Sequence, residues 1–238
     1  MLLEEITMAD FKNAIKKTRT VIVPYGTVEE HGRHLPLSTD TMVIVEVVKR
    51  VAKKIKVFVA PPVHYGVCTS TSQHPGTIGI TPETLRRITI DIVRDAYKKG
   101  LRRFILISGH GGGLHISSIK EAGEQLIEEL KDVQIAVLSI YDLVYKDITD
   151  IADTENDSHA GEMETSLILH LAETLVKGRS KEEYPRLPKP FLTKNKMKYW
   201  PGGVWGNPAV ASREKGKKLF EIMVSRTVGL VRDIEGFK

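Results

Sequence analysis

The 238-residue chain has a single cysteine, Cys68, which excludes an intramolecular disulfide and is compatible with a reducing compartment. It also lacks any run of 18 apolar residues, so we expect no membrane-spanning helix. The start, Met1-Leu-Leu-Glu-Glu, becomes acidic at once and does not resemble a secretory signal. These absences predict a cytoplasmic protein that does not associate with a membrane.

Charge of one sign is not concentrated anywhere in the chain. The net charge is only +5, and Lys and Arg are interspersed with Glu and Asp, so no basic stripe predicts nucleic-acid binding. A Gly/Ser/Pro-rich linker and a change in composition are also absent, so we expect one domain over residues 1–238. The glycines of residues 109–113 follow a strand pattern but lack the lysine of a phosphate-binding loop.

Strand-like and helix-like segments alternate along the chain. Short apolar runs predict strands at Thr20–Pro24, Lys56–Ala60, Arg103–Ile107 and Val133–Ile140. Periodic patterns and caps predict helices at Thr39–Ile55, Thr81–Lys99, Ser117–Leu130, His159 or Gly161 to Val176, and Ala211–Ile234. The segment Lys177–Lys198 is basic and interrupted by several prolines, which is typical of a surface loop. The alternation predicts an α/β fold with a mainly parallel sheet covered by helices on both faces.

A first polar cluster follows the strand that is expected to end at Pro24. Glu29, His31 and Asp40 lie there, at the sheet edge where parallel α/β proteins bind ligands. Residues 29 and 31 would face one side of an extended chain, and Asp40 has two oxygens that could bridge two metal ions. Carboxylate and imidazole ligands suit Zn²⁺, Mn²⁺ or Fe²⁺. The alternative is that Asp40 caps the next helix and the other two are solvated.

Two more clusters follow at predicted element ends. His110 comes directly after a strand, and the amides of Gly111 and Gly112 are free to bind a substrate oxygen; a tight turn with an incidental histidine is the alternative. His159, Glu162 and Glu164 stand at a predicted helix start, where acidic residues also stabilise the helix dipole.

Two further segments have open roles. His74, in a Ser/Thr/Gly-rich loop, could contact substrate or a neighbouring subunit, or be a polar turn residue. The Gly/Pro-rich segment Trp200–Pro208 could be a lid over a site or a packed surface loop.

Taken in order, these motifs resemble those of the creatininase family of metal-dependent amidohydrolases. The matching segments span about residues 20 to 220 and are Glu29-Glu-His31-Gly-x-His-Leu-Pro-x-x-Thr-Asp40, His74-Pro-Gly-Thr77, Ser108-Gly-His110-Gly-Gly, His159-Ala-Gly-Glu-x-Glu164-Thr-Ser, and Gly203-Val-Trp-Gly-Asn-Pro208 with Ala211-x-x-Glu214-Lys-Gly216.

The resemblance implies a three-layer α/β/α fold, two divalent metal ions per subunit, hydrolysis of a carbon–nitrogen bond, and a ring-like assembly, often a homohexamer. By position, Glu29, Asp40 and His110 would hold one metal. His31 and Asp40 would hold the other together with a further carboxylate. In creatininase the further carboxylate corresponds to the residue two places after the match to His110. In this chain that position is Gly112, which has no side chain to bind a metal.

Glu164 is the expected substitute for the missing ligand. Helical rotation turns it roughly 200° away from Glu162, so only one of the two can face the metal. Glu162 already has a structural explanation at the helix start, whereas Glu164 has none.

We therefore expect a hydrolase of small-molecule amides, such as cyclic amides or formamides, with His159 passing a proton to the leaving nitrogen. The tryptophans that enclose creatinine in creatininase have no counterparts between Tyr141 and His159, so creatinine itself is not the expected substrate. The alternatives are a peptidase-like relative acting on a modified-peptide cofactor precursor and a catalytically idle binding or scaffold protein of the same fold.

Overall fold

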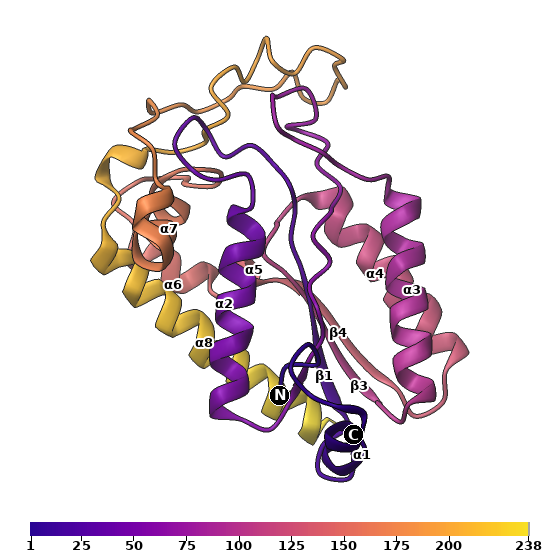
Figure 1. The fold of residues 1–238 in the computed structure, drawn as a ribbon. Coiled ribbons are helices and arrows are strands. Elements are labelled where there is room, and N and C mark those ends of the chain that lie inside the picture. Colours follow the sequence, from indigo (N-terminus) through magenta and orange to yellow (C-terminus); the bar gives the residue numbers. More distant parts are fainter. Residues whose placement is uncertain (238) are drawn as a thin grey trace.

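A four-stranded parallel sheet forms the centre of the molecule (Figure 1). The computed structural model describes residues 1–237. The strand order is β2-β1-β3-β4, with β1 at Thr20–Tyr25, β2 at Phe58–Val59, β3 at Arg103–Ser108 and β4 at Gln134–Ser139. Within the central pair, Thr20 lies opposite Arg103 and Tyr25 opposite Ser108, so both strands end at the same edge.

Helices cover both faces of this sheet and create two hydrophobic cores. On one face, α2 (Thr39–Lys54), α7 (Glu162–Ala172) and α8 (Arg213–Gly236) pack on Ile22 and Ile105. On the other, α1 (Met8–Ala14), α3 (Pro82–Lys98) and α4 (Gly113–Glu129) pack on Val21 and Phe104. Successive strand residues therefore face opposite cores, as the pleat requires. The predicted three-layer α/β/α fold is confirmed.

Local caps explain several boundaries. The Thr81 hydroxyl accepts from the amide of Thr84, Pro82 occupies the first turn, and α3 ends before Gly100, whose φ of +100° suits glycine. The Ser139 hydroxyl accepts from the amide of Tyr141 and starts the short helix α5 (Ile140–Leu143), which is followed by α6 (Tyr145–Thr149). The prediction that the fourth strand extends to Ile140 was therefore wrong by one residue.

Other boundaries also differ from the predictions. The second strand has two residues instead of five, and backbone bonds join its Val59 to Met1 and Leu3, so the N-terminal segment lies along its outer edge. Helix α4 begins at Gly113, four residues before the predicted Ser117, because the glycine turn continues directly into the helix. Helix α1 was not predicted; Thr7 and Asp10 form a capping box at its start. The predicted helix to Val176 ends at Ala172 and continues as a 3₁₀ turn, Glu173–Leu175.

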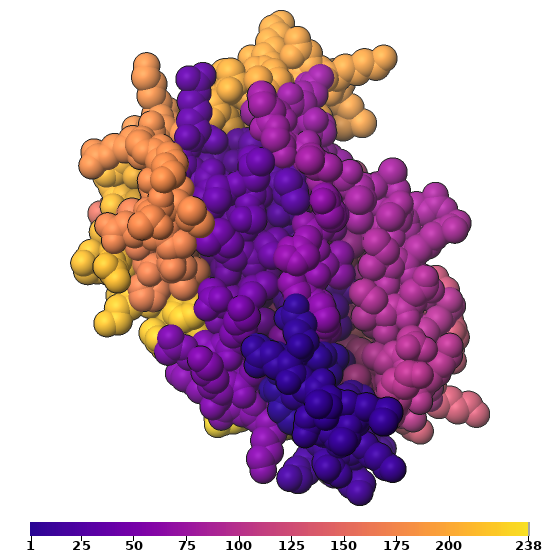
Figure 2. All heavy atoms as spheres, viewed as in Figure 1, coloured from indigo at the N-terminus to yellow at the C-terminus, as the bar shows by residue number. Residues whose placement is uncertain are grey.

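Loops gather over the carboxyl end of the sheet. The segment of residues 177–205, orange to yellow in Figures 1 and 2, lies beside the loop of residues 65–80 at the top of the molecule. Lys196 joins the two, since its amide donates to the Gln73 side chain at 2.7 Å and its ammonium group to the carbonyl of Thr69. A 3₁₀ turn at Pro208–Val210 leads from the first of these loops into α8. Within the described residues, no helix combines the length and apolarity that a bilayer crossing requires.

Helix α8 approaches α7 most closely at Gly216. A Cβ atom there would lie 1.8 Å from the backbone oxygen of Ser166, whereas a Cβ at Gly229, on the same helix, would meet nothing within 4 Å. We predict that Gly216→Ala lowers the free energy of unfolding by about 1–3 kcal/mol, because backbone must move to relieve the overlap. The matched Gly229→Ala variant should be stabilised by roughly 0.5–1 kcal/mol through helix propensity. Denaturant unfolding of both variants tests this, and equal stabilities would contradict it.

Candidate metal centre

Five of the predicted site residues converge at the carboxyl ends of β1 and β3. Glu29 and His31 lie in the loop after β1, Asp40 in the first turn of α2, His110 after β3, and Glu164 in the first turn of α7. All five residues are buried, none more than 9% exposed. The alternative role for Asp40 as a helix cap does not hold, because Ser38 is the N-cap of α2 and makes no side-chain cap bond.

The two carboxylate oxygens of Asp40 face different partners. Oδ2 lies 3.2 Å from Nδ1 of His110, which is also 2.9 Å from Oε2 of Glu29. Oδ1 lies 3.1 Å from Nε2 of His31, which is 3.6 Å from Oε2 of Glu164. The cluster therefore has two halves that meet at Asp40: Glu29 and His110 on one side, His31 and Glu164 on the other.

The His31 ring shows that the second half requires a positive charge. Its Nδ1 lies 3.1 Å from the carbonyl oxygen of Glu29, which can only accept, so Nδ1 carries a proton. In a neutral ring, Nε2 would then present a lone pair to the oxygens of Asp40 and Glu164. Such an arrangement is repulsive unless a proton or a metal ion lies between these atoms.

Proton affinities within the cluster follow the same logic. Burial lowers the pKa of His31, but the carboxylates of Asp40 and Glu164 raise it more, to about 10. Burial also lowers the pKa of His110, but the carboxylates of Glu29 and Asp40 outweigh it and raise this pKa well above its ordinary value. Burial would raise the pKa of Asp40, yet His31 and His110 hold it well below its usual range. Without another cation, His31 and His110 are therefore protonated and neutralise the carboxylates.

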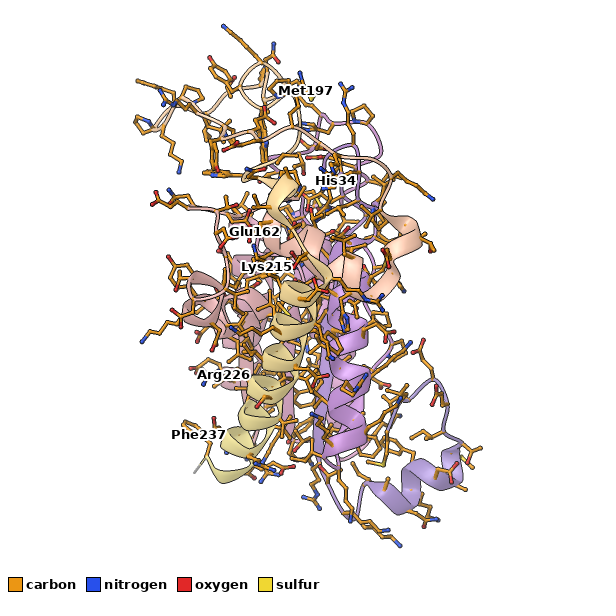
Figure 3. All side chains as sticks on the ribbon, turned by 90° about the vertical axis from the view of Figure 1, so that its left-hand side faces the viewer. His34, Glu162, Met197, Lys215, Arg226 and Phe237 are labelled. Carbon is orange, nitrogen blue, oxygen red and sulfur yellow. The ribbon has the colours of Figure 1, made fainter. Side chains whose placement is uncertain are left out.

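Glu162 points away from this cluster, although it is only two residues from Glu164. Its carboxylate accepts from the amides of Asp153 at 3.0 Å and Thr154 at 2.7 Å, and from the ammonium group of Lys215. Figure 3 shows Glu162 next to Lys215 at the upper part of α8. Glu164 instead accepts from the amide of Ala160 at 2.6 Å and faces His31. Of the two acids, only Glu164 joins the cluster.

The glycine turn after β3 makes room for the His110 ring. A Cβ at Gly112 would lie 2.2 Å from Nε2 of His110, so even alanine would displace the imidazole. Gly112 is also the N-cap of α4, and both it and Gly111 line the cavity beside the cluster. Their lack of side chains therefore serves the position of the histidine as well as access to the cavity.

His159 lies against the cluster on the cavity side. Its ring centre is 4.3 Å from that of His31 and 5.3 Å from that of Trp200. Nε2 donates to the carbonyl oxygen of Glu30 at 2.8 Å, which leaves Nδ1 as the second nitrogen of the ring. The next residue, Ala160, has a φ of +49°, a strained conformation for a residue with a Cβ, and it aims its amide at Glu164.

His74 lies outside the cluster. Its Nε2 donates to the carbonyl of Trp200 at 2.7 Å, and the two rings meet edge to face at 6.0 Å. It therefore holds Trp200, which is only 4% exposed, against the loop of residues 65–80. Of the two possibilities for the Trp200–Pro208 segment, this position favours the lid, because both of its tryptophans line the cavity.

A cavity of about 750 Å³ opens directly onto the cluster. The sequence pointed to the segment of Trp200 and Trp205 as a possible lid, but it did not identify another wall of the cavity, Tyr141 in α5. It also did not identify Thr71, whose hydroxyl donates to Oε1 of Glu29, or Thr27, whose hydroxyl donates to Asp40. Single polar or aromatic residues give no spacing signal, so their position beside the cluster is evident only in the folded chain.

The donor set fits two divalent cations. Three buried carboxylates, those of Glu29, Asp40 and Glu164, meet no lysine or arginine within the described residues, and only histidines lie in ion-pair range. Oε2 of Glu29 is buried and makes no well-formed hydrogen bond despite its short distance to His110. One trio, His31, Asp40 and Glu164, has its ligand atoms within 4.8 Å of one another. Oxygen and imidazole donors of this kind are typical ligands of Zn²⁺ and Mn²⁺.

Comparison with known proteins gives a consistent result. Residues 4–231 match a family model described as "Creatininase: Creatinine amidohydrolase". A mycofactocin precursor peptide peptidase of Mycolicibacterium smegmatis is 30% identical over 217 residues, which cover 86% of this chain and 81% of the relative. A creatinine amidohydrolase of Pseudomonas putida is 28% identical, with 96% of this chain and 95% of the relative covered.

A solved structure agrees closely in fold. A mutant creatininase of the Zn-Zn type superposes with a TM-score of 0.88 at 26% sequence identity, covering 98% of this chain and 97% of that one. The similarity extends over nearly the whole chain, so it includes every segment that contributes to the cluster.

Proposed function

Since the chain belongs to the creatininase family, a family of hydrolases, we propose that it hydrolyses a carbon–nitrogen bond of an amide with the aid of two divalent metal ions. The observation that supports this best is the position of Asp40 between two histidine–carboxylate pairs. Glu29, Asp40 and His110 would hold one ion, and His31, Asp40 and Glu164 the other. Two divalent ions sharing one carboxylate are the usual arrangement in two-metal hydrolytic sites.

When bound, the ions would supply a water molecule that is deprotonated near neutral pH and would polarise the carbonyl group of the substrate. The protein's own contribution is to position and to transfer protons. His159 is our candidate for moving the proton from the attacking water to the leaving nitrogen, because its ring lies beside His31 and lines the cavity. Its bond to the Glu30 carbonyl fixes the ring and keeps Nδ1 as the free nitrogen for this transfer.

The cavity wall restricts the charge of the substrate. It contains seven carboxylates and no lysine or arginine among the described residues: Glu29, Asp40, Asp142, Asp153, Glu155, Asp157 and Glu164. The three metal ligands would be neutralised by the ions, and Asp153 pairs with Lys215, but Glu155 has no cationic partner within 4 Å in the described chain. We therefore propose a neutral or cationic substrate, because an anion would face uncompensated negative charge on entry.

The size of the cavity leaves room for more than a small ring, since about 750 Å³ is within the range of sites for drug-sized ligands. This favours a larger amide, and it is also compatible with a peptide substrate, the runner-up reaction suggested by the peptidase relative. A binding or scaffold protein without activity is the alternative from another class. A homohexamer stays a prediction from the family resemblance, and a single domain over residues 1–238 stays a prediction from the composition of the chain.

The bridging role of Asp40 can be tested by metal content. We predict that Asp40→Ala loses both ions and all turnover while it keeps its fold, because each ion loses a charged ligand. The control is Glu155→Ala, which removes an exposed carboxylate of the same cavity and should retain both ions. Elemental analysis and circular dichroism measure the two properties, and a fully loaded Asp40→Ala protein would disprove the bridge.

A second pair of variants separates the neighbouring acids of α7. Glu164→Gln should lower occupancy to about one ion per chain and abolish turnover, because the second ion loses its only other carboxylate. Glu162→Gln should keep both ions and lower the free energy of unfolding, by roughly 1–3 kcal/mol, because it weakens a buried acceptor of Lys215 and two amides. The opposite pattern of metal loss would transfer the ligand role to Glu162.

The reaction itself is tested by a hydrolysis screen of metal-reconstituted protein with lactams, formamides, ureas and short peptides. Each type of substrate that is cleaved should then be compared in cationic, neutral and anionic derivatives. We predict that the anionic form has the lowest kcat/KM, by about fivefold (~1 kcal/mol), and that Glu155→Gln narrows the difference. A chain that binds two ions but cleaves none of these compounds would favour the scaffold alternative.

A further inference from the structure

The only cysteine of the chain lies beside the metal centre. Cys68 belongs to the loop between β2 and α3 and is 5% exposed. Its sulfur, a carboxylate oxygen of Glu29 and a ring nitrogen of His110 all lie within 4.8 Å of one another. Three chemically different donors from three separate loops therefore meet at the half of the cluster that Glu29 and His110 form with Asp40.

The loop that contains Cys68 is fixed in this position by bonds on both sides of the thiol. The amide of Val67 donates to Nδ1 of His115 at 3.1 Å, and Nε2 of that buried ring donates to the hydroxyl of Ser108 at 3.1 Å. On the other side, the hydroxyl of Thr71 donates to Oε1 of Glu29. The loop around Cys68 is therefore held both to the end of β3, through His115, and to the loop that contains Glu29.

A second observation indicates that a ligand belongs between these donors. Glu29 is 2% exposed, and its Oε2 is buried without a well-formed hydrogen bond. The other oxygen of the same carboxylate is occupied by Thr71, so the unpartnered one faces His110. A buried anionic oxygen without a hydrogen bond is costly unless a cation completes its environment.

We propose that Cys68 is a sulfur ligand of the metal ion held by Glu29, Asp40 and His110. The proposal rests on the metal centre proposed above. On binding, the thiol proton is released to solvent and the sulfur bonds to the metal as a thiolate, so the bound ion gains one negative ligand. The first site then has one sulfur, one nitrogen and two carboxylate groups, whereas the second has only nitrogen and oxygen donors.

This asymmetry predicts different metal preferences for the two halves. Thiolate favours Zn²⁺ and Co²⁺ over Mn²⁺, while imidazole and carboxylate alone accept all three. The first site would therefore select zinc from a mixture, and the second would follow metal availability. The competing explanation is a buried thiol that packs against the cluster as a small apolar residue without bonding to the metal.

Cobalt substitution distinguishes the two explanations without any substrate. We expect the full-length protein loaded with Co²⁺ to show the near-ultraviolet charge-transfer band of a sulfur–cobalt bond. Because the chain has no other cysteine, a thiolate band can only come from Cys68. Cys68→Ser should lose this band and keep the visible bands of bound cobalt. Ser70→Ala, a change in the same loop, should retain both.

Metal competition provides a second measurement. With Zn²⁺ and Mn²⁺ offered together, Cys68→Ser should lower the zinc preference of one site per chain by about tenfold or more, and the other site should not change. Cys68→Ala should behave in the same way, which separates the loss of sulfur from any effect of the new hydroxyl.

The outcomes separate this inference from the proposed function. Two bound cobalt ions without the band, or a band that persists in Cys68→Ser, would overturn the sulfur ligand and leave the hydrolase proposal intact. The band in a protein that cleaves no amide would support the ligand and argue against the function. A chain that takes up no cobalt would overturn both.

Discussion

The burial of three carboxylates at one point is the constraint on which the rest of this structure depends. Glu29, Asp40 and Glu164 approach one another without a lysine or arginine in the described chain to neutralise them. Like charges in a poorly solvated space repel strongly, so the arrangement is stable only with cations between the oxygens. A histidine can either hold a proton there or bind a metal ion through the same nitrogen, and the nearest partners of the carboxylates are the histidines His31 and His110.

The fold supplies this convergence through its parallel sheet. Because β1 and β3 are neighbours and end in register, the loops after them deliver Glu29 and His110 to one place. Helices α2 and α7 begin above the same edge and add Asp40 and Glu164 from their first turns. Close packing keeps these elements in position: Gly112 admits the His110 ring, and Gly216 allows α8 to lie directly on α7.

Sequence reasoning anticipated most of this framework, because strands, helix starts and ligand clusters each have a local pattern. The direction of Glu162 and Glu164 was also predictable, since helix geometry separates residues two apart. The positions of Cys68 and Tyr141 beside the cluster were not, because they depend on how the chain folds over the sheet edge. The strand at β2 was predicted but its length was overestimated, and its outer neighbour was not anticipated: this is the N-terminal segment, a pairing between distant residues that no local pattern indicates.

The two halves of the cluster depend on different parts of the fold. Glu29, Asp40 and His110 are anchored around the central strands, which contain some of the most deeply buried side chains of the molecule. Glu164 depends on the first turn of α7 and on the strained Ala160 just before it. Fraying of that single turn would withdraw Glu164 from His31 and leave the other half assembled. The two halves of the cluster therefore differ in local stability, and the half formed by His31 and Glu164 would be the first to come apart on partial unfolding.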